Sequence, residues 1–136
     1  MKPEDIKIIK EFPPFIENII AAGLKPERTT IFPFGNVIYN PSGKDIPDDI
    51  MIHEAVHIKQ QGENPADWWE RYLKDKGFRL SQELEANREQ YKFICKIFKD
   101  RNARTRALIK IAANMAGEVY GKMINITEAM NLIKNG

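Results

Sequence analysis

Residues 52–62 read IHEAVHIKQQG, and this stretch holds the only two histidines of the 136-residue chain. His53 and His57 are four residues apart, with Glu54 directly after the first. Residues at i and i+4 lie one turn apart on the same face of an α-helix, so in a helix both imidazoles can reach one ion. The spacing therefore predicts a metal site, and neutral imidazole nitrogens suit zinc. The alternative is an ordinary pair of core or surface histidines.

The sequence around the histidines begins and ends as a helix does. Residues 46–49 read IPDD, which places a proline in the first turn and two acids near the positive end of the helix dipole. Gly62 is typical of a helix end. Apolar side chains cover more than half of the helix circumference, so we expect the helix to pack between layers.

The rest of the chain predicts a mainly helical α+β fold in a single domain over 1–136. Within 29–43, β-branched and aromatic residues around Gly35 favour two short strands, with Pro33 at an edge or a bulge. The other expected elements are a helix over 3–22 kinked or split at Pro13–Pro14, helices over 65–74, 79–99 and 103–121, an extended piece over 122–126, and a helix over 128–134 capped by Thr127.

Composition and net charge indicate the general class of protein. An apolar content of 43% suits one compact core, and a net charge of +2 does not indicate nucleic-acid binding through bulk electrostatics. The basic run 101–106, RNARTR, is read as a solvated helix start, and a phosphate-binding patch of Arg101, Arg104 and Arg106 is the alternative.

Cysteine and hydropathy bear on the compartment. The single cysteine, Cys95, excludes an intramolecular disulfide and is expected to be a small core residue. The N-terminus lacks the apolar segment of a signal peptide, and no run approaches the roughly 20 apolar residues of a membrane span. We therefore expect a soluble, cytoplasmic protein with no membrane partner.

A third metal ligand has to come from a carboxylate or from Cys95, because no histidine remains. The predicted helix over 79–99 offers Glu83, Glu85 and Glu89. On a helical wheel Glu83 lies about 60° from the centre of the apolar stripe, whereas the other two lie on the far side with lysines. An unpaired carboxylate facing the core would be costly, so Glu83 is the expected ligand.

Asn87 lies one turn beyond Glu83 on the same apolar stripe. It is a candidate to orient a ligand imidazole through a hydrogen bond. The alternative is a buried asparagine bonded to the backbone.

These residues resemble a known class of enzymes. The pattern His53-Glu54-x-x-His57 followed by Glu83-x-x-Ala86-Asn87 resembles the gluzincin class of zinc peptidases, in which a second helix supplies a metal-binding glutamate. The small size and the order of elements are similar to the minimal soluble gluzincins, or minigluzincins. The stretches 69–73 and 78–91 also resemble small phage-encoded HExxH proteins. One difference is that Asn87 stands where the larger families usually have aspartate, which would affect catalytic strength more than metal binding.

The resemblance and the residues together predict a zinc metallopeptidase with one zinc per chain and a peptide or protein substrate. Glu54 is expected to act as general base and then acid. An extended substrate could pair with the edge of the 29–40 hairpin. Tyr120 and Tyr72 are candidate donors to the oxyanion, and core packing is the alternative for both, as it is for Trp68 and Trp69.

The C-terminal segment 122–136 has two interpretations. Minigluzincins resemble latent enzymes, so this amphipathic segment could cover the cleft of a zymogen, or it could cap the core. Two other function classes stay open: a non-catalytic zinc-binding structural or interaction protein, and a nucleic-acid-associated factor that uses the basic run.

Overall fold

A computed structural model describes residues 5–136 of the chain, and it confirms the mainly helical α+β class. The start of the helix expected from Pro3 lies outside the described residues. In chain order the elements are β1 (Lys7–Ile9), α1 (Ile16–Ala21), β2 (Phe32–Phe34), β3 (Val37–Tyr39), α2 (Asp48–Gln61), α3 (Pro65–Lys74), α4 (Lys76–Ile97), α5 (Arg101–Met115), the 3-10 turn η2 (Glu118–Tyr120) and α6 (Ile126–Lys134).

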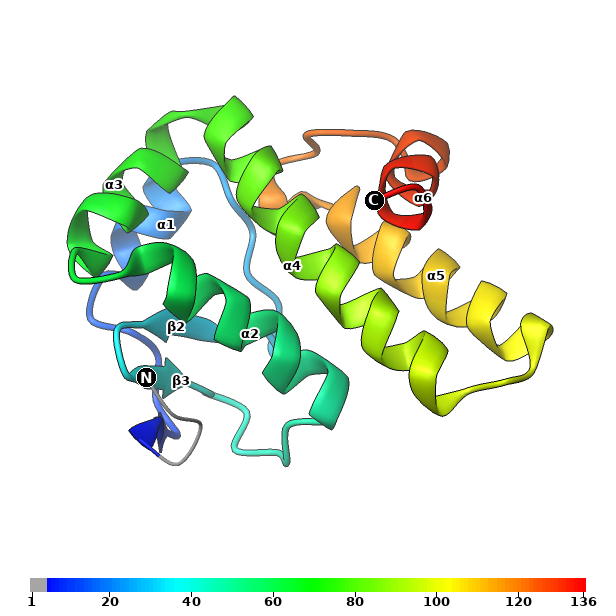
Figure 1. Ribbon diagram of the computed structural model, residues 1–136. Coiled ribbons are helices and arrows are strands. Elements are labelled where there is room, and N and C mark those ends of the chain that lie inside the picture. The colour runs from blue at the N-terminus through cyan, green and yellow to red at the C-terminus, as the bar shows by residue number, and fades with distance from the viewer. Residues whose placement is uncertain (1–4) are drawn as a thin grey trace.

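Helix α4 is the centre of the fold. It contacts α2 and α3 on one side and α5 and α6 on the other, as Figure 1 shows. The small sheet lies on the α2 side, and β2 contacts α2. The helix with both histidines is therefore held between the sheet and α4, as its broad apolar surface predicted.

The sheet has the order β1-β3-β2, with β1 parallel and β2 antiparallel to β3. Pro33 is the central residue of β2, which is an edge strand, so the predicted edge position is confirmed. Proline has no backbone N–H to give to a neighbouring strand and is tolerated at an edge for that reason.

The helix expected over 3–22 is wrong in its first half. Residues Lys7–Ile9 form β1, and the Lys7 amide donates to Asn36 O at 2.8 Å while the Asn40 amide donates to Ile9 O at 2.7 Å. A short apolar run can form either a strand or a helix, and here pairing with β3 decides. Helix α1 begins only at Ile16, after the two prolines.

Several helices begin or end at other residues than the apolar periodicity predicted, and capping side chains mark the observed starts of α4 and α6. Helix α4 begins at Lys76 because the Asp75 carboxylate accepts from the Phe78 amide. Helix α5 ends at Met115, short of the expected residue 121. Residues 122–125 form no strand, and α6 is capped by Asn125, whose side chain accepts from the Glu128 amide, rather than by Thr127.

The basic run begins α5, as expected, but Arg104 is not simply solvated. Its guanidinium donates to Cys95 O at 2.7 Å and also to Phe98 O, at the C-terminal end of α4. Cys95 itself is half-buried. Arg104 therefore satisfies carbonyls that the end of α4 leaves without an intrahelical partner.

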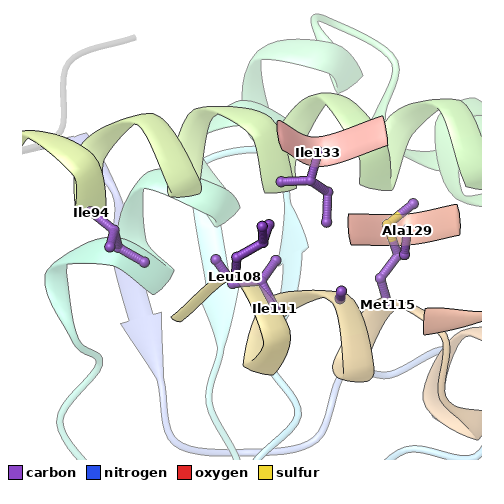
Figure 2. Packing of buried hydrophobic residues seen from close by; sticks show 7 residues of the cluster. Ile94, Leu108, Ile111, Met115, Ala129 and Ile133 are labelled. Carbon is purple, nitrogen blue, oxygen red and sulfur yellow. The ribbon is translucent and has the colours of Figure 1, made fainter. Parts of the chain in front are cut away.

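The core has two clusters. One joins α1, β2 and α3 through aromatic side chains that include Trp68, Trp69 and Tyr72. The other lies between α4, α5 and α6, and Figure 2 shows its buried residues Ile94, Leu108, Ile111, Met115, Ala129 and Ile133. None of the helices in 5–136 has the length and apolar content to cross a membrane.

Helix α6 contributes Ala129 and Ile133 to the second cluster, so it packs as part of the core. We expect Ile133→Ala to lower the free energy of unfolding by about 2–4 kcal/mol, because a fully buried side chain is removed. Leu132→Ala, at a residue 38% exposed, is the matched control and should cost much less. Denaturant unfolding of both variants measures this, and equal losses would contradict the assigned packing.

Candidate metal centre

The three predicted ligands meet where α2 packs on α4. Nε2 of His53 lies 3.1 Å from Oε1 of Glu83, and Nε2 of His57 lies 3.0 Å from Oε2 of the same carboxylate. The two imidazole Nε2 atoms are 3.1 Å apart. All three side chains are buried, and each offers one ligand atom within 4.8 Å of the others. This group could hold a metal ion.

The spacing of the three ligand atoms suits such an ion. Tetrahedral coordination with bonds of roughly 2.0–2.1 Å places neighbouring ligand atoms roughly 3.3–3.4 Å apart. The two imidazole Nε2 atoms, 3.1 Å apart, are slightly closer than this, and each lies 3.0–3.1 Å from a different oxygen of Glu83. Three protein ligands would leave a fourth position for water or substrate.

The helical wheel correctly separates the three glutamates of α4. Glu83 is 2% exposed and faces α2, whereas Glu85 and Glu89 are exposed. Figure 1 shows α2 lying alongside α4, which allows one carboxylate of α4 to reach two successive turns of α2.

Electrostatics favour an ionised Glu83 beside the histidines. Burial alone would raise the pKa of Glu83, but the charge of His57 and hydrogen bonds from both imidazoles hold it well below its usual range. Burial also opposes a charged His57, yet the charge and hydrogen bond of Glu83 raise the pKa of that imidazole. The pocket therefore already favours a negative carboxylate facing positive charge.

Two glutamines orient the imidazoles from behind. Nδ1 of His53 lies 3.0 Å from Oε1 of Gln90, and Nδ1 of His57 lies 2.8 Å from Oε1 of Gln60. An amide oxygen only accepts hydrogen bonds, so these contacts place a proton on Nδ1 of each ring. In the neutral ring Nε2 is then unprotonated and able to bind a metal, whereas in the charged ring Nε2 donates to Glu83.

Both glutamine amides are themselves held in place. Gln90 Nε2 donates to Asp49 Oδ2 at 2.8 Å, while Gln60 Nε2 donates to Gln82 O at 3.0 Å and Glu85 Oε1 at 2.8 Å. Each imidazole is thus linked through an amide to a carboxylate, which fixes the orientation of the amide group.

The orienting role predicted for Asn87 is therefore taken by Gln90. Asn87 is buried next to the site but makes no hydrogen bond to either imidazole within the described chain. The sequence analysis missed Gln90 and Gln60. A signal was present for both: Gln90 follows Glu83 by two turns on the same face of α4, and Gln60 follows His57 by three residues on α2.

The two candidate tyrosines differ in what their hydroxyls do. The Tyr72 hydroxyl donates to Glu83 Oε2 at 2.6 Å, so it is committed to the ligand carboxylate. For Tyr120, burial together with the charges of Glu83 and Glu54 raises the pKa of the hydroxyl well above its usual value. Tyr120 therefore stays protonated, and it lines the same cavity as both carboxylates.

Glu54 lies next to the ligands without a hydrogen-bond partner among residues 5–136. Burial raises its pKa to about 8, and the nearby charges of His53 and Glu83 act in opposite directions on it. A buried carboxyl group without a partner costs folding free energy, so a structural role does not explain this residue.

A cavity of about 990 Å³ opens beside the ligands. Its lining includes His53, His57, Glu83 and Glu54, together with apolar side chains of β2, α4 and α5. No residue of α6 contributes to this lining, whereas Ala129 and Ile133 of α6 belong to the core cluster.

We expected a substrate to pair with the edge of the hairpin, but Pro33 of β2 has no backbone group available for such pairing. Proline lacks the N–H, and its carbonyl already accepts from Gln61 Nε2 at 2.8 Å and Trp69 Nε1 at 2.7 Å. A carbonyl oxygen has two lone pairs, and both are used. Trp68 and Trp69 are buried as expected from packing, although the ring of Trp68 also lies 5.3 Å from that of His57.

Comparison with known proteins adds no family assignment: no protein-family model, no curated protein and no solved structure matches this chain.

Removal of the ligand carboxylate should abolish metal binding. We expect Glu83→Gln to lose the metal because a neutral amide is a far weaker ligand. Glu85→Gln, at an exposed residue on another face of α4, should keep the metal. Metal content after loading and desalting measures both, and equal loss in the two variants would contradict the ligand assignment.

Burial of Glu54 predicts a pH-dependent stability. With a pKa of about 8 when folded and 4.5 as the ordinary value, Glu54 is protonated in the folded chain but ionised in the unfolded chain between these values, so folding weakens as pH rises through this range. In metal-free protein, the melting temperature of Glu54→Gln relative to wild type should rise from pH 5 to pH 8.

Thermal unfolding in a chelator measures this difference, and the same substitution at the exposed Glu17 is the control. Zinc, whose charge favours the ionised carboxylate, should reduce the difference in melting temperature between Glu54→Gln and wild type. A difference that stays constant with pH would show that Glu54 ionises normally.

Proposed function

We propose that this protein is a zinc-dependent peptidase with a gluzincin-type site. The observation that carries the proposal is the buried His53–His57–Glu83 group with an unpartnered glutamate, Glu54, immediately beside it. A site that only stabilised the fold would have no use for that additional carboxyl group.

Zinc is the metal that this set of ligands favours. Two imidazoles and one carboxylate form a recurrent set in catalytic zinc sites, which keep one position for water or substrate. Magnesium and calcium prefer sites made of oxygen atoms. The glutamine contacts that leave both Nε2 atoms facing Glu83 suit imidazole ligation.

When bound, zinc would supply a Lewis acid that acidifies water and polarises the scissile carbonyl. Glu54 then has the general base role: its carboxylate takes a proton from water and returns it to the leaving amine. In the metal-free chain burial raises the pKa of Glu54 to about 8, and the charge of a bound zinc would lower it toward neutrality, where a carboxyl group can both accept and release a proton.

Tyr120 is the better candidate to stabilise the developing oxyanion. It lines the cavity that contains Glu54, whereas the Tyr72 hydroxyl is already bonded to Glu83. The Tyr120 hydroxyl stays protonated and can donate to a substrate oxygen. Tyr72 is then assigned to holding the ligand carboxylate.

The alternative functions have less support. A non-catalytic zinc protein does not account for the burial of Glu54. Nucleic-acid binding through the basic run has less support because the guanidinium of Arg104 is already hydrogen-bonded to carbonyls at the end of α4.

The test is Glu54→Ala in zinc-loaded protein. We expect about one zinc per chain to remain and cleavage of an unfolded protein substrate to fall by about 10²–10⁴-fold, since the proton acceptor is lost and no ligand is touched. Glu63→Ala, at an exposed glutamate just beyond α2, is the control. Unchanged cleavage in Glu54→Ala would exclude the proposed mechanism.

A further inference from the structure

Asn87 is the second buried polar side chain of the site without a partner. It is 3% exposed, yet within the described residues it has no hydrogen bond, as is also true of Glu54. The other buried polar residues of the described chain all have partners: Asn40, His53, His57, Gln61, Arg79, Glu83 and Gln90.

Both unpartnered side chains border the same cavity. Asn87 and Glu54 appear together in its lining with the candidate ligands. In residues 5–136, every side-chain nitrogen or oxygen that is fully inaccessible has a hydrogen-bond partner, so the amide of Asn87 must reach the cavity surface. Its hydrogen-bonding capacity is directed to whatever fills that space.

Support of the metal ligands does not explain Asn87. Glu83, one turn before it, contacts the imidazoles directly, and Gln90, three residues after it, occupies Nδ1 of His53. An apolar side chain would cost less at a buried position on this stripe. An amide whose donor and acceptor groups both face a cavity is available to a ligand that enters it.

The chemistry of the amide identifies the kind of ligand. A carboxamide has an N–H donor and an oxygen acceptor side by side, which complements the C=O and N–H of a peptide unit. The central residue of edge strand β2 cannot supply this pair, because Pro33 has no N–H and its carbonyl is occupied. A substrate main chain in the cavity therefore needs another amide to bind.

We propose that Asn87 binds a main-chain amide of the substrate and so sets the register of the peptide against Glu54. The proposal rests on the proposed peptidase function for the identity of the substrate. It assigns to an α4 side chain the backbone recognition that a strand edge would otherwise provide.

The experiment uses acetyl-leucyl-leucine N-methylamide and its ester analogue, in which the central amide N–H is replaced by oxygen. Binding is measured by NMR titration of the full chain carrying Glu54→Gln, which prevents cleavage, with and without zinc. We expect the amide to bind about tenfold more tightly than the ester, as the loss of one or two neutral hydrogen bonds implies.

Asn87→Leu, which has a similar shape but no amide, should bind the two probes alike and keep its zinc. Asn131→Leu, at an exposed asparagine of α6 away from the cavity, should keep the tenfold preference. The proposal is overturned if Asn87→Leu retains the preference, if it loses zinc, or if the parent protein binds neither probe.

The two proposals can fail separately. If the wild-type protein neither keeps zinc nor cleaves a polypeptide while the Asn87-dependent preference persists in metal-free protein, the peptidase function is wrong and the peptide site stands. If cleavage is observed but Asn87→Leu does not alter the preference for the amide, the peptidase function stands and the peptide-binding role of Asn87 is wrong.

Discussion

The contact of one buried carboxylate with two imidazoles is the constraint on which the structure around the site depends. Glu83 is almost completely withdrawn from water, and such a group is tolerated only where opposite charge and hydrogen bonds replace its hydration. His53, His57 and the Tyr72 hydroxyl provide this replacement. Because these partners come from α2 and α3, the requirements of one carboxylate fix how both helices pack against α4.

This packing extends outward through polar side chains rather than apolar ones. Gln90 connects His53 to Asp49, and Gln60 connects His57 to the exposed Glu85. The imidazoles are therefore oriented by neutral amides whose own positions are set by carboxylates farther away. A direct carboxylate partner would make an imidazole more basic than an amide does. The arrangement thus favours fixed ring orientation without adding a further buried charge beside Glu83 and Glu54.

The sequence predicted those features of the fold and of the candidate site that depend on residues close together in the chain. The α2 helix, its end at Gly62 and the inward position of Glu83 follow from periodicity and end signals, and the structure confirms them. Strand β1 was predicted as helix because its pairing with β3 joins segments about thirty residues apart. Gln90 was overlooked in favour of Asn87 since both lie on the same face of α4, and only the position of α2 along α4 decides which one meets His53.

Side chains without partners are as informative as those with them. A folded chain leaves few buried polar groups unsatisfied, because each one lowers stability. In the described chain, the two buried polar residues that lack a hydrogen bond, Glu54 and Asn87, border one cavity and flank one ligand group. One offers a carboxyl group that can exchange a proton, and the other an amide that matches a peptide unit. Their joint placement is best explained by a molecule that enters the cavity and engages both groups.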